Sequence, residues 1–243
     1  MPDTTLRTPA GEVAAYLALP AGQGPWPGVV VLHELLGLNA DIRAQADRFA
    51  ARGYVALAPD LFSFRRPKAV CVLAAFRALG KRSGPAFDAI EAARAALAAR
   101  ADATGRVGVI GFCMGGAFAL LAAPSAGFAA SSVNYGVLPR NPREVLRGAC
   151  PVVGTYGGSD RMLRGTAAKL EAALAANGVE HDVKEYPGAG HSLLNRHRGR
   201  VPELIDRVGG LGYHAPSAPD AYRRIDAFLD RHVAGREPGE RVS

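Results

Sequence analysis

Residues 107–116 read VGVIGFCMGG, an apolar run that enters Gly-x-Cys-x-Gly and continues into a segment of small residues. An apolar strand, a sharp glycine turn and a helix form the context of a nucleophile elbow, with Cys113 at the position of the nucleophile. Gly111 and Gly115 would let the strand and the helix approach closely, where side chains would clash. Because Cys113 falls at a helix N-terminus, the helix dipole and the free N–H groups are expected to favour its thiolate. Taken alone, Cys113 could equally be a buried cysteine in an ordinary turn between a strand and a helix.

The same alternation of apolar runs and longer periodic segments extends in both directions from this stretch. It predicts strands over 13–19, 28–32, 54–58, 106–110, 129–135, 152–156 and 182–186, and helices over 39–51, 84–100, 113–123, 163–177 and 219–233. Strands that alternate with helices of ten or more residues indicate crossover connections and a mostly parallel sheet with helices on both faces. The fold class is therefore α/β. The longer connections at 60–70 and 192–218 are expected to shape a pocket.

Length and composition indicate one domain. The chain has 243 residues, of which 49% are hydrophobic and 21% are charged, which excludes a disordered protein. We expect a single domain over 1–243 with a flexible tail at 234–243. No apolar run reaches the roughly 18–20 residues of a membrane span, and the first residues lack a signal-peptide pattern. With three cysteines, an odd number, reduced thiols in the cytoplasm are the expectation.

Charge and short motifs exclude several other classes. The net charge is +7, but the basic residues are dispersed and are not interleaved with aromatic residues, so nucleic-acid binding is not expected. Neither G-x-G-x-x-G nor G-x-x-x-x-G-K-[ST] occurs, which argues against a nucleotide site. His33-Glu34 begins like the zinc motif H-E-x-x-H, but its fifth position is Gly37. We therefore expect no metal and no cofactor.

Two residues downstream of the elbow complete a catalytic pattern. Asp160 follows the predicted strand 152–156 and a glycine turn, and His191 follows the predicted strand 182–186 and a glycine loop. The chain order is nucleophile, acid, base, as in α/β hydrolases. Parallel strands end at one edge of a sheet, so we expect Cys113, Asp160 and His191 to meet there. Individually, Asp160 could cap the next segment and His191 could be a surface histidine.

Four stretches together resemble the dienelactone hydrolase family of the α/β-hydrolase superfamily, over about residues 10–232. They are GFCMGG at 111–116, HELLGL at 33–38, YVALAPDLF at 54–62 and GAGHS at 188–192. The resemblance implies an enzyme of the carboxymethylenebutenolidase type, which opens a lactone or ester in the breakdown of catechol-type aromatic compounds. It implies a triad of Cys113 as nucleophile, His191 as base and Asp160 as its orienting acid, and a thioester acyl-enzyme.

The resemblance also suggests supporting residues. Glu34 matches the family glutamate that helps to ionise the thiol when substrate arrives, although it could instead be a loop carboxylate that pairs with a neighbour. In an α/β hydrolase the oxyanion hole uses backbone N–H groups at two positions, here Leu35 and Met114. Tyr135 matches a tyrosine of the family pocket, with a strand-end core aromatic as the alternative.

The substrate-binding residues match the family less well. The family holds the substrate carboxylate with two arginines, one of them four residues after the catalytic histidine, where this chain has Asn195. The other position falls at Ala69 or Val70. The nearest substitutes are Arg196 and Arg66, so we expect a small lactone or ester substrate and leave open whether it is anionic.

Other functions remain open from the sequence. One is a thioesterase or carboxylesterase with another small substrate. From a different class come a non-catalytic binding protein and a thiol redox sensor on the same fold, although a sensor needs a resolving thiol and neither Cys71 nor Cys150 is expected to reach the elbow. The chain is expected to be a monomer or a small homo-oligomer.

Overall fold

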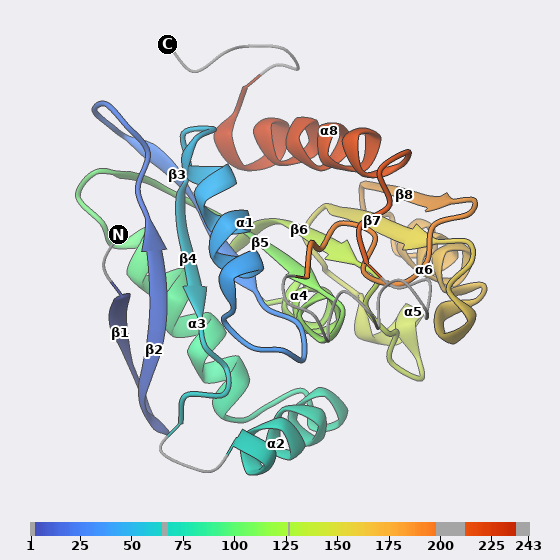
Figure 1. Ribbon diagram of the computed structural model, residues 1–243, viewed down its shortest axis with the longest axis horizontal. Coiled ribbons are helices and arrows are strands. Elements are labelled where there is room, and N and C mark those ends of the chain that lie inside the picture. The colour runs from blue at the N-terminus through green and yellow to red at the C-terminus, as the bar shows by residue number, and fades with distance from the viewer. Residues whose placement is uncertain (1–2, 65–67, 126, 198–211, 237–243) are drawn as a thin grey trace.

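A computed structural model describes residues 3–64, 68–125, 127–197 and 212–236. Its centre is a sheet of eight strands (Figure 1). The strand order is β1-β2-β4-β3-β5-β6-β7-β8. β1 and β2 pair antiparallel, as do β2 and β4, and every later pairing is parallel. The bounds are β1 Asp3–Thr8, β2 Gly11–Ala18, β3 Trp26–Leu32, β4 Val55–Pro59, β5 Ala103–Phe112, β6 Phe128–Asn134, β7 Val152–Gly157 and β8 His181–Tyr186. The predicted α/β class with a mostly parallel sheet is confirmed.

Helices pack on the sheet in two groups. Side chains of α1 (Ala40–Ala50) and α8 (Ala218–Leu229) share one buried cluster. Side chains of α2 (Lys68–Lys81), α3 (Pro85–Ala98) and α4 (Met114–Ala122) share another. The other helical segments are α5 Pro142–Val145, η1 Arg161–Leu163, α6 Thr166–Ala175 and η2 Asp230–Ala234.

The predicted elements correspond closely to the observed ones, with a few differences. The side chain of Asn39 accepts a hydrogen bond from the N–H of Ile42 at 3.0 Å, which confirms it as the N-cap of α1. The predicted helix at 163–177 divides into the 3₁₀ turn η1 and the helix α6, because Gly165 between them has a left-handed φ of 72°. β1, α2 and the short α5 were not predicted.

The residues expected in the site follow β3, β5, β6, β7 and β8, which are parallel and adjacent in the sheet. The segments that leave their carboxyl ends therefore lie along one edge. Within the described part of the chain, no helix is long and apolar enough to cross a membrane. The tail expected at 234–243 begins at the last residue of η2, Ala234, and its residues 237–243 lie outside the described part.

Candidate active site

Cys113 lies in a strained turn between β5 and α4. Its φ is 53° and its ψ is −113°, a backbone conformation that a residue other than glycine rarely adopts. Its N–H donates to the carbonyl oxygen of Asn134 at 3.0 Å, which ties the turn to the end of β6. A Cβ at Gly111 would lie 1.9 Å from the carbonyl oxygen of Gly115, and a Cβ at Gly115 would lie 2.3 Å from that of Leu32. Both glycines are therefore required by close backbone approach, as the sequence predicts.

His191 and Asp160 form a buried pair. His191 Nδ1 lies 2.6 Å from Asp160 Oδ2, and the two residues are 8% and 5% exposed. The other carboxylate oxygen, Oδ1, accepts from the N–H of Met162 at 3.0 Å, which fixes the orientation of the acid. His191 Nε2 is buried and has no hydrogen-bond partner among the described residues. A histidine held at Nδ1 by a carboxylate keeps Nε2 available for proton transfer.

The ionisation of Cys113 differs from the expectation drawn from its helix N-terminus. Burial, together with the smaller effect of the charges of Glu34 and Asp160, raises the pKa of the thiol from 9.0 to about 11. The backbone N–H of Met114 opposes this rise but does not offset it. Desolvation thus outweighs the helix terminus, so the surroundings of Cys113 favour the neutral thiol in the absence of substrate.

Glu34 follows β3 and is buried beside the elbow. Its Oε1 lies 2.7 Å from His197 Nε2, and both side chains are almost fully shielded from solvent. The preceding His33 holds the loop in place, since its Nε2 accepts from the N–H of Leu61 at 2.9 Å. Its Nδ1 therefore carries the proton and donates to the carbonyl oxygen of Glu34 at 2.6 Å. His33 thus has a structural partner on each ring nitrogen.

The two expected oxyanion-hole donors are backbone N–H groups on either side of this region. Met114 is the first residue of α4, so its N–H has no partner within the helix. Leu35 lies on the loop after β3, and its N–H donates to no backbone carbonyl of the described residues.

A buried hydrogen-bonded chain runs from α1 to the histidine loop. Tyr135 Oη donates to Asn195 Oδ1, and Asn195 Nδ2 donates to Asp41 Oδ2. Asp41 Oδ1 also accepts from the N–H of Arg196 at 3.0 Å. The Tyr135 ring packs edge-on against the imidazole of His191, with their centroids 5.2 Å apart. This chain therefore holds the loop that carries His191.

The remaining expected residues are placed as follows. Tyr135 is fully buried with its hydroxyl committed to Asn195. The side chain of Arg196 is exposed, and its guanidinium lies 3.5 Å from the centroid of the Tyr213 ring. Arg66 lies outside the described residues.

Two residues of the site were not singled out from the sequence. His197 occurs in a run rich in arginine, which suggests a solvated basic segment, and Asp41 occurs in the first turn of a helix, where acidic residues are common. Neither pattern signals that the side chain is buried beside catalytic groups. No group of three or more metal-ligating side chains occurs among the described residues.

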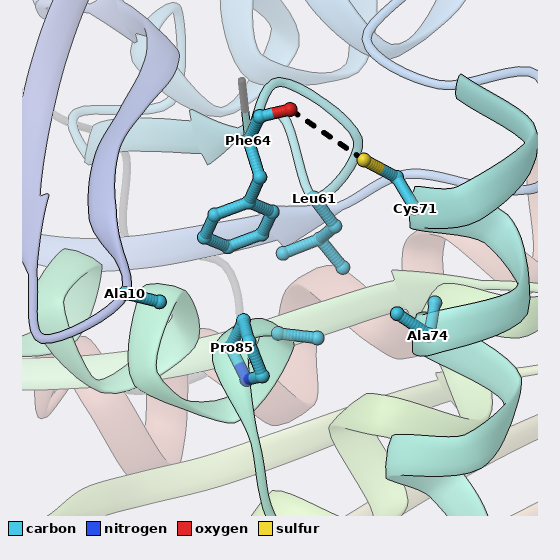
Figure 2. Close-up of a pocket in the computed structure, with 8 residues that line it drawn as sticks. Ala10, Leu61, Phe64, Cys71, Ala74 and Pro85 are labelled. Carbon is cyan, nitrogen blue, oxygen red and sulfur yellow. Dashed lines mark hydrogen bonds between the residues drawn. The ribbon is translucent and has the colours of Figure 1, made fainter. Parts of the chain in front are cut away.

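An apolar cavity of about 40 Å³ lies between α2, α3 and the segment after β4 (Figure 2). Its lining includes Leu61, Phe64 and Cys71, whose Sγ donates to the carbonyl oxygen of Phe64 at 3.6 Å. This space could hold about one water molecule and is too small for an ester substrate. Among the described residues, Cys71, Cys113 and Cys150 form no disulfide bond.

The sequence model of the dienelactone hydrolase family matches residues 13–233. The chain belongs to the dienelactone hydrolase family. Two relatives, from Methylorubrum extorquens and Yersinia pestis, are each named "Putative carboxymethylenebutenolidase". The first is 31% identical and covers 91% of this chain and 78% of its own. The second is 29% identical and covers 97% of this chain and 90% of its own.

Solved structures agree on the fold. A dienelactone hydrolase-like promiscuous phosphotriesterase from metagenomic libraries superimposes with a TM-score of 0.75 at 23% identity, covering 96% of this chain and 98% of its own. The α/β-hydrolase fold and a hydrolase activity on esters follow from the family membership together with this architecture.

Proposed function

We propose that this family member hydrolyses a small lactone or ester through a triad of Cys113, His191 and Asp160. The observation that carries the proposal is the buried pair of His191 Nδ1 and Asp160 Oδ2 at 2.6 Å. It lies at the same edge of the sheet as the strained elbow of Cys113. A nucleophile on a strained turn, together with a histidine oriented by an acid, is suited to nucleophilic acyl transfer.

The proposed reaction begins from the neutral thiol. When the substrate excludes water, the Glu34 carboxylate accepts the thiol proton, and Cys113 Sγ attacks the carbonyl carbon. The N–H groups of Leu35 and Met114 stabilise the oxyanion. The ester C–O bond then breaks, the leaving oxygen takes up the proton that the thiol released, and a thioester remains.

Water completes the cycle. His191 Nε2 removes a proton from water, and the resulting hydroxide attacks the thioester carbonyl. The C–S bond breaks, the acid leaves, and the imidazolium returns its proton to Sγ. Asp160 stabilises the imidazolium that forms in this step and keeps Nδ1 protonated.

Glu34 has a second role in the resting protein. Its contact with His197 at 2.7 Å holds the carboxylate beside the elbow, and its charge disfavours the thiolate before substrate binds. A nucleophile that ionises only when substrate is bound is protected from adventitious oxidation, because the thiolate is the reactive form. This feature favours a hydrolase over a thiol redox sensor.

The test compares wild type with Cys113→Ala on neutral enol lactones, aryl esters and acyl thioesters. We expect turnover of at least one class by wild type, and a loss of at least about 10³-fold in kcat/KM in the variant. Preference for the thioesters would identify a thioesterase built on the same triad. Full activity of Cys113→Ala, or no turnover by wild type on any class, would contradict the proposal.

A further inference from the structure

Large apolar side chains that are exposed to solvent occur on the segments that leave the carboxyl edge of the sheet and on α2. Within the part of the chain that the structure describes there are seven: Leu35, Leu36, Val70, Leu73, Phe76, Val137 and Met162. Four of them lie on the segments that leave β3, β6 and β7. The other three lie on α2, which packs against α4, the helix that begins next to Cys113.

The sheet order places the first four around the elbow. β5 ends at Cys113, and β3 and β6 are its two neighbours, with β7 next to β6. All four strands are parallel, so the segments after them meet at the carboxyl edge. Leu35 and Leu36 directly follow Glu34, Val137 comes shortly after Tyr135, and Met162 comes shortly after Asp160. We call Leu35, Leu36, Val137 and Met162 the apolar rim.

The rim side chains are 45%, 47%, 54% and 69% exposed in this order. Scattered apolar residues on a protein surface are common, but a group of them around a reactive centre marks a binding surface.

The polar side chains behind the rim are largely committed to one another. The Asn195 amide contacts Asp41 with its nitrogen and Tyr135 with its oxygen, and all three side chains are buried. Likewise Glu34 contacts His197. The rim side chains themselves are apolar, and the exposed charged side chains next to them include Arg161, beside Met162, and Arg196, whose guanidinium is stacked on Tyr213.

We propose that the apolar rim binds the hydrocarbon part of the substrate, so that the enzyme selects uncharged esters and lactones with short alkyl groups over anionic ones. The proposal rests on the proposed function, since it assigns the substrate class of the same site. Each methylene transferred from water to such a surface favours binding by up to about fourfold. A carboxylate placed against hydrocarbon would instead lose hydration without a compensating partner.

The experiment measures kcat/KM for 4-nitrophenyl acetate, butyrate, pentanoate and hemisuccinate. Pentanoate and hemisuccinate are of similar length and differ chiefly in the terminal carboxylate. We expect kcat/KM to rise about two- to fourfold per methylene from acetate to pentanoate. Pentanoate should exceed hemisuccinate by at least about tenfold.

Near-isosteric polar variants locate the effect. The double variant Val137→Thr with Met162→Gln should lower the ratio of pentanoate to acetate kcat/KM by about fivefold or more. Ala176→Gln, which places the same amide on an exposed position after α6, should leave that ratio unchanged. Equal loss on both esters would assign the two rim residues a structural role and overturn the proposal.

Two other outcomes are distinguished by parallel assays. If wild type prefers hemisuccinate and Arg196→Gln abolishes that preference, the site binds anions through Arg196 and the proposal is overturned while the triad remains intact. If Cys113→Ala hydrolyses every ester as fast as wild type, the proposed function itself fails, and with it the assignment of the rim.

Discussion

The thiol of Cys113 should react slowly in the free enzyme, even though it is the proposed nucleophile. Burial, with the charges of Glu34 and Asp160, raises its pKa from 9.0 to about 11. Below pH 9 a rise of two units leaves about 100-fold less thiolate. A more basic thiolate is also a better nucleophile, and a Brønsted coefficient of about 0.4–0.5 recovers roughly tenfold. The net expectation is exchange about tenfold slower than that of an unperturbed thiol.

The assay is thiol–disulfide exchange with a dithiodipyridine, followed by absorbance at several pH values, with glutathione as the unperturbed thiol. Peptide mapping assigns the modified residue. Cys150 provides an internal comparison, because burial raises its pKa to about 12. The rate at Cys113 should keep rising to about pH 11.

A charge variant tests the cause of this slow exchange. Glu34→Gln removes a charge that disfavours the thiolate, so exchange at Cys113 should become faster near pH 8 and its midpoint should move to lower pH. The same substitution at the exposed Glu171 of α6 should change neither quantity. Exchange at Cys113 as fast as that of glutathione at pH 7, with a midpoint at or below about 8.5, would refute this reasoning.

Three further predictions concern the elbow and the histidine. Gly115→Ala should prevent stable folding, because its Cβ would lie 2.3 Å from a backbone oxygen. Gly80→Ala in α2 has open space around the new Cβ and should instead raise the stability by about 0.5–1 kcal/mol. Thermal denaturation measures both effects. Asp160→Asn should reduce kcat by about 10³- to 10⁴-fold with an unchanged circular dichroism spectrum, since the imidazole loses its orienting acid. Asp182→Asn, which alters a pair with Arg224 away from the triad, should retain activity in the same assay, and equal losses in the two aspartate variants would argue against Asp160 as the triad acid. Asp41→Asn should lower the stability measured by urea denaturation by about 1–3 kcal/mol and reduce kcat more than it changes KM, because the loop that carries His191 loses its anchor. A variant with normal stability and normal kcat would show that the hydrogen bonds of Asp41 do not position the histidine.

The parts of the fold that follow from hydrophobic periodicity could be predicted from the sequence. β3 and the second half of β5, residues 107–112, are continuous apolar runs because they are buried on both faces. β1 lacks such a signal, since it is an edge strand in which Leu6 alone is buried. α2 begins directly after three residues outside the described part, in a segment that the sequence suggests is a loop.

The site likewise has features that could be predicted from the sequence and features that could not. The order of Cys113, Asp160 and His191 along parallel strands was enough to predict that they share an edge, and His191 and Asp160 are in contact in the structure. The pKa of Cys113 could not be predicted, because it depends on how deeply the thiol is buried. Contacts between distant segments, such as Asn195 with Asp41, leave no periodic pattern in the sequence, and so these residues were found only in the structure.

The central claim is that Cys113 forms a thioester with the substrate. The most direct test is rapid acid quenching of the enzyme with 4-nitrophenyl butyrate, followed by intact mass spectrometry and peptide mapping. We expect one butyryl group on the peptide that contains Cys113. Hydroxylamine should remove it, and it should accumulate in His191→Ala, where water is no longer activated. Turnover without acylation of Cys113 in either protein, or a butyryl group on another residue that persists in Cys113→Ala, would contradict it.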